Sequence, residues 1–334
     1  MEDAMSSITK HIPIWLKEPL FLFATEMGSV PFCVAWSHAR CSYAELRGLA
    51  ESAVSPVFKK ANHCIQRYLR KKYGYILNGH RYTPGIPVKN APIWVFWWQG
   101  MEYAPEMVQR CVASIKRNSG SHPVHIITQR NYTQYVSLPA AILEKVGNSI
   151  SLTHFSDILR MNLLADHGGY WLDATIFVTR SLPERTFDTP VYTGRNPGSD
   201  NRNISAWRWT GYAIAGWKGN SLFVLAKELF NTYWEHETRL IDYFLIDHVI
   251  AMIYEAIPEV RSQIDGIPVN NTDQQLLHEA FSKAVEPVLL ESFLSREDTW
   301  LYKLTWKTAY PEQTADNGDT IYSRWKRITE EPVP

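Results

Sequence analysis

Apolar positions along the central part of the chain change between a strand-like and a helix-like pattern. The near-continuous apolar run Ile93–Trp98 is rich in β-branched and aromatic residues and is typical of a buried strand. A second short strand is predicted at Val124–Thr128. Amphipathic spacing predicts helices over residues 106–116, 140–146 and 155–167. This alternation predicts an α/β layer with a largely parallel sheet.

The longest of these helices leads into a strand that carries an acidic residue. The pair Gly168-Gly169 is the expected stop of the helix. Strand-like pieces, Tyr170–Leu172 and Thr175–Val178, then lie on either side of Asp173. Later patterns predict helices over residues 222–234, 241–254 and 272–284, and a strand within 299–306.

Residues 78–92 are rich in turn formers and separate this region from a helical segment before it. Apolar residues between Val54 and Leu69 recur at helical spacing, and the other face carries lysines and arginines from Lys59 to Lys72. Two interpretations stay open. The helix packs on the main domain with a solvated basic face, or its cationic face contacts anionic lipid.

Composition excludes several classes of protein. The chain has 334 residues, 45% of them hydrophobic, with 34 basic and 34 acidic side chains, so it supports a sizeable core and lacks the positive charge of a general nucleic-acid binder. Four cysteines are too few for a disulfide framework. The polar start and an apolar stretch (residues 20–36) broken by Glu26, Gly28 and Pro31 predict neither a signal peptide nor a membrane span. We therefore expect a soluble, cytoplasmic protein.

Asp157 and Arg160 lie three residues apart on the predicted helix, so they share one face among mostly apolar neighbours. Such a charged pair must be paired internally or face a polar cavity. One interpretation is a buried salt bridge with Asp173 as a turn former. The other is a ligand site at the carboxyl end of the strand, where Asp173 holds a divalent cation that bridges a diphosphate.

The segment Ser156–Arg160 followed by Gly168–Asp173 resembles the donor-binding segment of GT-A glycosyltransferases. The most similar families are the capsular polysaccharide synthesis glycosyltransferases, the mannosyl/galactosyltransferases with an Asp-X-Asp motif, and the clostridial glucosylating toxins. The resemblance covers residues 93–182, fades over the C-terminal third and is absent before the linker. It implies an α/β, Rossmann-like GT-A fold (86–320) with an N-terminal helical extension (1–85) and a C-terminal tail (321–334).

The resemblance also implies roles for individual residues. Asp157 would bind hydroxyls of the donor, Arg160 would reach the donor sugar and diphosphate, and Asp173 would be the first acid of the Asp-X-Asp motif and a metal ligand. Trp98 would stack on the uracil ring. Strand alternation makes Trp97 and Trp98 face opposite ways, so we expect at most one of them to face the ligand.

Three further features bear on the site. The motif reads Asp173-Ala174-Thr175, so the second carboxylate, which usually coordinates the metal, is missing. Lys303 and Lys307, in a run similar to one in capsule-type relatives, are candidates for binding the phosphates or are exposed lysines on a strand. Asp247, in an apolar helix, is a candidate for a catalytic or acceptor-side role, and Asn203 for acceptor binding.

The resemblance, taken with these features, implies a hexosyltransferase that uses Mn²⁺ or Mg²⁺. It would transfer galactose or glucose from a UDP-sugar, with retention, to a hydroxyl of a capsular or other surface polysaccharide intermediate. The acceptor would be a glycan or a lipid-linked oligosaccharide, with peripheral contact at the inner membrane surface and no nucleic-acid partner. The alternatives are a catalytically degenerate nucleotide-sugar or glycan-binding partner of an assembly complex, and a hydrolase of activated sugars.

Overall fold

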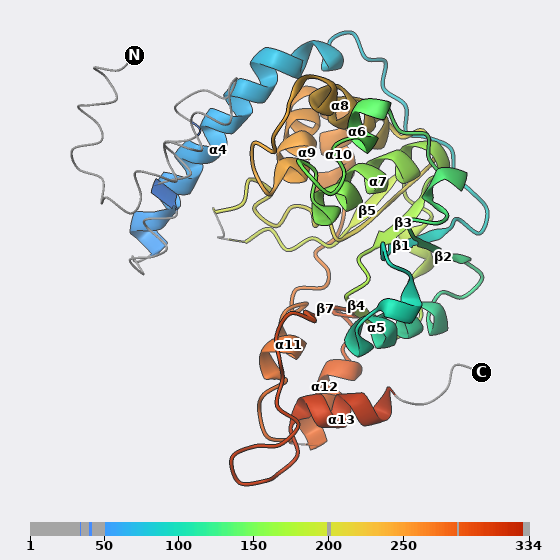
Figure 1. The fold of residues 1–334 in the computed structure, drawn as a ribbon, viewed down its shortest axis with the longest axis vertical. Coiled ribbons are helices and arrows are strands. Elements are labelled where there is room, and N and C mark those ends of the chain that lie inside the picture. The colour runs from blue at the N-terminus through green and yellow to red at the C-terminus, as the bar shows by residue number, and fades with distance from the viewer. Residues whose placement is uncertain (1–33, 35–39, 42–50, 199–201, 286, 330–334) are drawn as a thin grey trace.

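The computed structural model describes residues 34, 40–41, 51–198, 202–285 and 287–329 (Figure 1). The expectations for the polar start, for the apolar stretch up to Trp36 and for most of segment 1–50 lie outside these residues. The described chain combines a central sheet with helices and begins with one long helix. The α/β class and the N-terminal helical extension are therefore confirmed.

The central sheet has five strands in the order β2-β1-β3-β6-β5. Strand β1 (Ile93–Phe96) pairs in parallel with β2 (Val124–Ile127) and with β3 (Gly169–Leu172). Strands β6 (Ala213–Gly216) and β5 (Val191–Thr193) continue the sheet in antiparallel pairings. The three strands that the sequence pattern predicted, β2, β1 and β3, are thus parallel. The two strands that it did not predict, β6 and β5, pair antiparallel.

Helix α7 (Leu152–His167) is the central helix of the fold and is buried along most of its length. Ser151 caps its start by accepting a hydrogen bond from the backbone N–H of His154, and Gly168 ends it with a φ of 69°. Helices α8 (Ser221–His236), α9 (Leu245–Ala256) and α10 (Pro258–Asp265) gather on the same side of the sheet, whereas α5 (Glu106–Arg117) lies on the other (Figure 1). The short α6 spans Ala140–Leu143.

Gly169 allows β3 to enter the sheet directly after α7. Its φ is 102°, and a Cβ atom there would lie 2.1 Å from the carbonyl oxygen of Pro92. Only glycine fits this close approach between two backbones. The tight turn delivers the strand that ends at Leu172, so Asp173 follows at the carboxyl edge of the parallel strands.

A second, smaller sheet pairs β4 (Ile176–Val178) with β7 (Leu301–Lys303) in antiparallel register. It adjoins a separate hydrophobic cluster that includes α11 (Leu276–Ala280), α12 (Pro287–Leu294) and α13 (Ile321–Ile328). The expected tail 321–334 therefore contains a packed helix, because the side chain of Trp325 is fully buried in this cluster. The pairing of β7 with β4 brings Lys303 opposite Ile176, beside the end of β3.

Helix α4 (Glu51–Tyr73) lies along α8 and α9, and its apolar face is used in that packing. Ile65, Leu69 and Tyr73 are almost completely buried. The structure therefore shows the helix packed on the main domain. Contact of its basic face with anionic lipid stays a prediction, because that contact does not use the apolar face. The remaining basic side chains form a solvated face with ion pairs from Arg70 to Glu255 and from Lys72 to Glu237.

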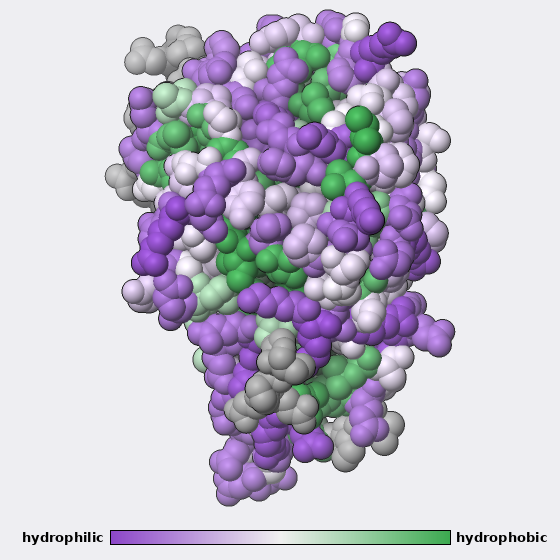
Figure 2. Space-filling view, turned by 90° about the vertical axis from the view of Figure 1, so that its right-hand side faces the viewer, coloured by the Kyte–Doolittle hydropathy of each residue, from purple (hydrophilic) through white to green (hydrophobic). Residues whose placement is uncertain are grey.

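The hydropathy of the surface is that of a protein whose apolar helix faces are buried. In Figure 2, hydrophilic residues predominate on the face shown, and apolar residues form separate patches. Within the described part of the chain, every helix is too short or too polar to cross a bilayer.

Candidate active site

A cleft of about 550 Å³ opens where the first and third strands end. Its walls come from the segment after β1, the first turns of α7, the residues that follow β3, and the chain from Lys303 to Lys307. The carboxyl edge of parallel strands is the usual place for ligands in open α/β sheets. The sequence-predicted residues Trp98, Asp173, Lys303 and Lys307 all line this cleft.

A row of alternating charges runs from the interior into the cleft. Arg160 donates to Asp157 over 2.7 Å and to Asp173 over 3.1 Å. The ammonium of Lys303 donates to the other oxygen of Asp173 over 2.7 Å. The expected Asp157–Arg160 salt bridge is present, and it continues into the cleft instead of ending there.

The place of Asp173 at the cleft end of this row determines its exposure and its pKa. Asp157 and Arg160 are buried, whereas the side chain of Asp173 is 27% exposed. Burial favours the neutral acid at Asp173, but the charges of Lys303 and Arg160 outweigh it and lower the pKa of this carboxyl below its ordinary value. Asp173 is thus held as an anion between two cations.

Aromatic rings form one wall of the cleft. Trp98 packs its edge against Phe155, with ring centroids 5.6 Å apart, and Trp97 packs against Trp306 at 5.9 Å. Both Trp97 and Trp98 line the cleft. Because β1 ends at Phe96, strand alternation does not fix the sides of the two rings, and the expectation that at most one of them faces a ligand stays a prediction.

Asp247 lies apart from the cleft lining, in the first turn of α9. Its two oxygens accept hydrogen bonds from the indole N–H of Trp209 at 2.8 Å and from the side-chain amide of Asn203 at 3.0 Å. Burial raises the pKa of Asp247 to about 6, although both hydrogen bonds act in the opposite direction. Asp247 is therefore part of a buried polar network and does not line the cleft.

This raised pKa predicts a pH-dependent stability. The folded protein holds the proton of Asp247 more tightly than the unfolded chain, so stability from this group is full below about pH 4 and is lost as the pH rises through about 6. The loss amounts to about 2–3 kcal/mol. Chemical denaturation of the wild type and of Asp247→Asn over this range should show the variant gaining relative stability as the pH rises. Parallel curves would show that Asp247 is ionised like an exposed acid.

The described protein side chains of the cleft offer a divalent cation one carboxylate, and that carboxylate is already paired with cations. Mg²⁺ and Mn²⁺ take several oxygen ligands, from one or two carboxylates together with substrate phosphates and water. Among the described residues that line the cleft, Asp173 is the sole acid, and both of its oxygens already accept hydrogen bonds. In the same part of the chain, no group of three or more His, Cys, Asp or Glu side chains is arranged to hold a metal ion.

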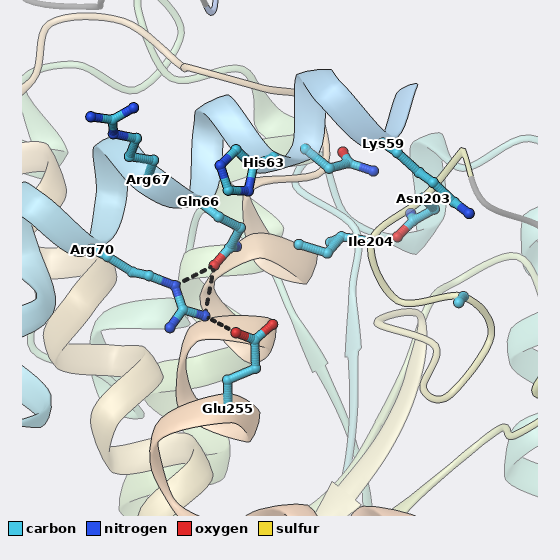
Figure 3. A pocket seen from close by; sticks show the side chains of 10 residues that line it. Lys59, His63, Gln66, Arg67, Arg70, Asn203, Ile204 and Glu255 are labelled. Atoms are coloured by element: carbon cyan, nitrogen blue, oxygen red, sulfur yellow. Dashed lines mark hydrogen bonds and ion pairs between the residues drawn. The ribbon is translucent and has the colours of Figure 1, made fainter. Parts of the chain in front are cut away.

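A second cavity, of about 580 Å³, was not predicted from the sequence (Figure 3). Basic residues of α4, including Lys59 and Arg67, form one wall, and the loop with Asn203 and Ile204 forms the opposite wall. Arg70 is held between Gln66 and Glu255 at its edge. The basic face of α4 was visible in the sequence, but its pairing with a loop about 140 residues away was not.

A known protein family matches most of the chain. The family described as "Capsular polysaccharide synthesis protein" matches residues 49–325. The match includes α4 and continues through β7, which corrects the expectation that the resemblance is absent before the linker and fades in the C-terminal third.

Two individual proteins are also similar to this chain. Glycosyltransferase afumC of Aspergillus fumigatus (strain CBS 144.89 / FGSC A1163 / CEA10) is 26% identical over 175 residues, which is 47% of this chain and 44% of that protein. The chain thus aligns with less than half the length of this curated relative. Among solved structures, the PaToxG glycosyltransferase aligns with a TM-score of 0.37 and 17% identity, over 63% of this chain and 82% of that one.

Proposed function

Because the chain belongs to the capsular polysaccharide synthesis protein family, we propose that it is a glycosyltransferase of polysaccharide assembly. Its donor would be a UDP-hexose, with galactose or glucose as the sugar, and its acceptor a hydroxyl of a capsular or other surface glycan intermediate. The transfer would retain the anomeric configuration. The observation that carries the proposal is the cleft itself, whose lining combines tryptophan rings with the cationic side chains of Lys303 and Lys307.

The two kinds of lining residue match the two parts of a nucleoside diphosphate. A flat ring such as that of Trp98 stacks on a base, whichever base it is. Lys303 and Lys307 supply positive charge for phosphate oxygens. Arg160 is buried and does not line the cleft, but it donates to Asp173 and so helps to fix the carboxylate that holds Lys303.

The chemistry that follows needs positioning and charge more than a strong base. The bond between the sugar C1 and the β-phosphate oxygen breaks, and the electron pair stays on that oxygen. The acceptor oxygen forms the new bond to C1, and its proton passes to the released diphosphate. Cations fixed near the leaving oxygen stabilise the charge that develops there. Holding both substrates in register supplies the remaining acceleration.

The acceptor side is proposed to involve the second cavity. Its basic wall suits an anionic acceptor group, such as the phosphate of a lipid-linked oligosaccharide. Asn203 lies in this cavity and also donates to Asp247, which in turn interacts with Arg160 through charge. In this proposal Asp247 positions Asn203 and does not itself contact the acceptor.

A direct test measures UDP binding by calorimetry and then incubates the full chain with UDP-galactose or UDP-glucose and a candidate glycan acceptor. Transfer to the acceptor is the expected result. UDP binding without turnover would favour the degenerate binding partner, an alternative that the missing second acid at Thr175 keeps relevant. Release of free sugar that does not depend on acceptor would favour a hydrolase.

Replacing Trp98 with alanine is expected to weaken UDP binding by about 1–3 kcal/mol, because stacking on the base is lost. The Michaelis constant for the donor should rise more than the turnover number falls, since stacking is present in the ground state and in the transition state alike. Calorimetry with UDP measures the effect. Trp98→Phe, which keeps a ring, should retain most of the affinity. Unchanged binding in Trp98→Ala would assign Trp98 to the core.

A further inference from the structure

The register of the small sheet places a lysine inside the shortened acidic motif. Residue Lys303 pairs with Ile176, and the backbone N–H of Leu304 donates to the carbonyl of Thr175 over 2.9 Å. The side chain of Lys303 therefore leaves β7 directly beside Asp173 and Thr175. Its ammonium also lies 5.2 Å from the ring centroid of Tyr212, which limits its freedom further.

The ammonium of Lys303 bridges the two ends of the motif. It lies 2.7 Å from the carboxylate of Asp173 and 2.8 Å from the hydroxyl of Thr175. These are the first and third positions of Asp173-Ala174-Thr175, the positions at which an Asp-X-Asp sequence carries its two acids. The positive charge of Lys303 thus lies between the side chains of Asp173 and Thr175.

Two observations argue against exchange of this lysine for a divalent cation. The second oxygen of Asp173 is already shared by Arg160 and the indole N–H of Trp171, at 3.1 and 2.9 Å. A metal ion that displaced Lys303 would gain one carboxylate oxygen and one hydroxyl, and it would lie close to two cationic side chains. The single negative charge of Asp173 is already balanced by Arg160, so the ion would be held by phosphate oxygens and water with a cationic side chain beside it.

We propose that Lys303, bridging Asp173 and Thr175, replaces the divalent cation at the donor diphosphate, so that donor binding and sugar transfer need no metal ion. This inference rests on the proposed function, because it assumes that the ligand of the cleft is a nucleoside diphosphate. Lys307, exposed at the same rim, adds a second positive charge toward the phosphates. The negative charge that forms on the β-phosphate oxygen during transfer is then neutralised by ammonium groups.

The first test uses the unmodified full chain. Its dissociation constant for UDP is measured by calorimetry in buffer with excess EDTA and again with Mn²⁺. Equal affinity in the two buffers is the expected result. Binding that appears only with Mn²⁺ would overturn the metal-free inference and leave the proposed function in place. Absence of UDP binding in both buffers would overturn the proposed function, and the inference with it.

The second test removes the charge of the lysine. Lys303→Met keeps most of the side-chain length and should weaken UDP binding in EDTA by roughly 10- to 100-fold, the value of a lost charge-assisted hydrogen bond. Lys116→Met changes an exposed lysine on α5, outside the cleft, and should leave binding unchanged. A thermal melt verifies that both variants fold. A folded Lys303→Met protein with unchanged affinity would refute the role of the lysine, and if it does not fold, the EDTA titration decides alone.

Discussion

Changing Asp173 to asparagine is expected to slow sugar transfer by roughly 10²- to 10³-fold, the usual cost when one fixed cation that stabilises transition-state charge is displaced. Asparagine offers one acceptor oxygen in place of two, and its amide N–H₂ group would face Arg160 or Lys303. One of the two cations would then lose its anchor. Affinity for UDP should change little, because removal of a negative charge beside the diphosphate offsets the loss of positioning.

The measurement is steady-state turnover together with calorimetric UDP binding. Asp166→Asn is a matched control, since Asp166 forms an ion pair with Lys227 at 2.7 Å outside the cleft, and its loss should affect turnover very little. Normal turnover in a folded Asp173→Asn protein would exclude Asp173 from the reaction. If Mn²⁺ instead strengthens UDP binding by the wild type but not by the Asp173→Asn protein, Asp173 is a metal ligand.

Replacing Glu237 with alanine is expected to lower the free energy of unfolding by about 3–5 kcal/mol, because it leaves a buried cluster without its acceptor. The carboxylate follows α8 and accepts hydrogen bonds from Tyr68 at 2.5 Å, Lys72 at 2.6 Å and Tyr73 at 2.7 Å. All three donors come from α4. Burial and the nearby carboxylate also raise the pKa of the Tyr73 hydroxyl well above its ordinary value.

Urea denaturation of the full chain measures this effect. Glu255→Ala is the matched control on the same helix interface, because Glu255 pairs with Arg70 at an exposed position and its loss should cost about 0–1 kcal/mol. If Glu237→Ala were as stable as Glu255→Ala, the attachment of α4 would rest on its apolar face alone.

Local patterns were enough to predict the elements whose ends carry their own signals. The Gly-Gly stop predicted the end of α7, and its Asp157–Arg160 pair follows from helical spacing. Its start was expected at Phe155 but lies at Leu152, because Ser151 caps the helix. Helix α9 begins at Leu245, four residues later than expected, because the side chain of Asp242 accepts from the backbone N–H of Phe244 and forms a turn before it. The expected helix 272–284 is reduced to the five residues Leu276–Ala280.

Elements defined by distant partners could not be predicted in this way. Strands β5 and β6 are three and four residues long, and β6 is built largely of small residues. Gly216 in β6 is required because a Cβ atom there would lie 2.0 Å from the ring of Phe223. In the site, the contact between Asp173 and Lys303 depends on the β4–β7 register across 130 residues. No local signal encodes that register.

The late position of β7 has a consequence for the order in which the protein is made. All five strands of the central sheet lie before residue 217, so a nascent chain can complete that sheet while β7 is still unsynthesised. Such an intermediate would already contain Trp98, Asp173 and Arg160, but it would lack the ammonium of Lys303, the second cation that contacts Asp173. Domains generally fold as units from the N-terminus during synthesis. A growing chain should therefore acquire affinity for the donor only after its last tenth has begun to emerge and β7 has paired with β4.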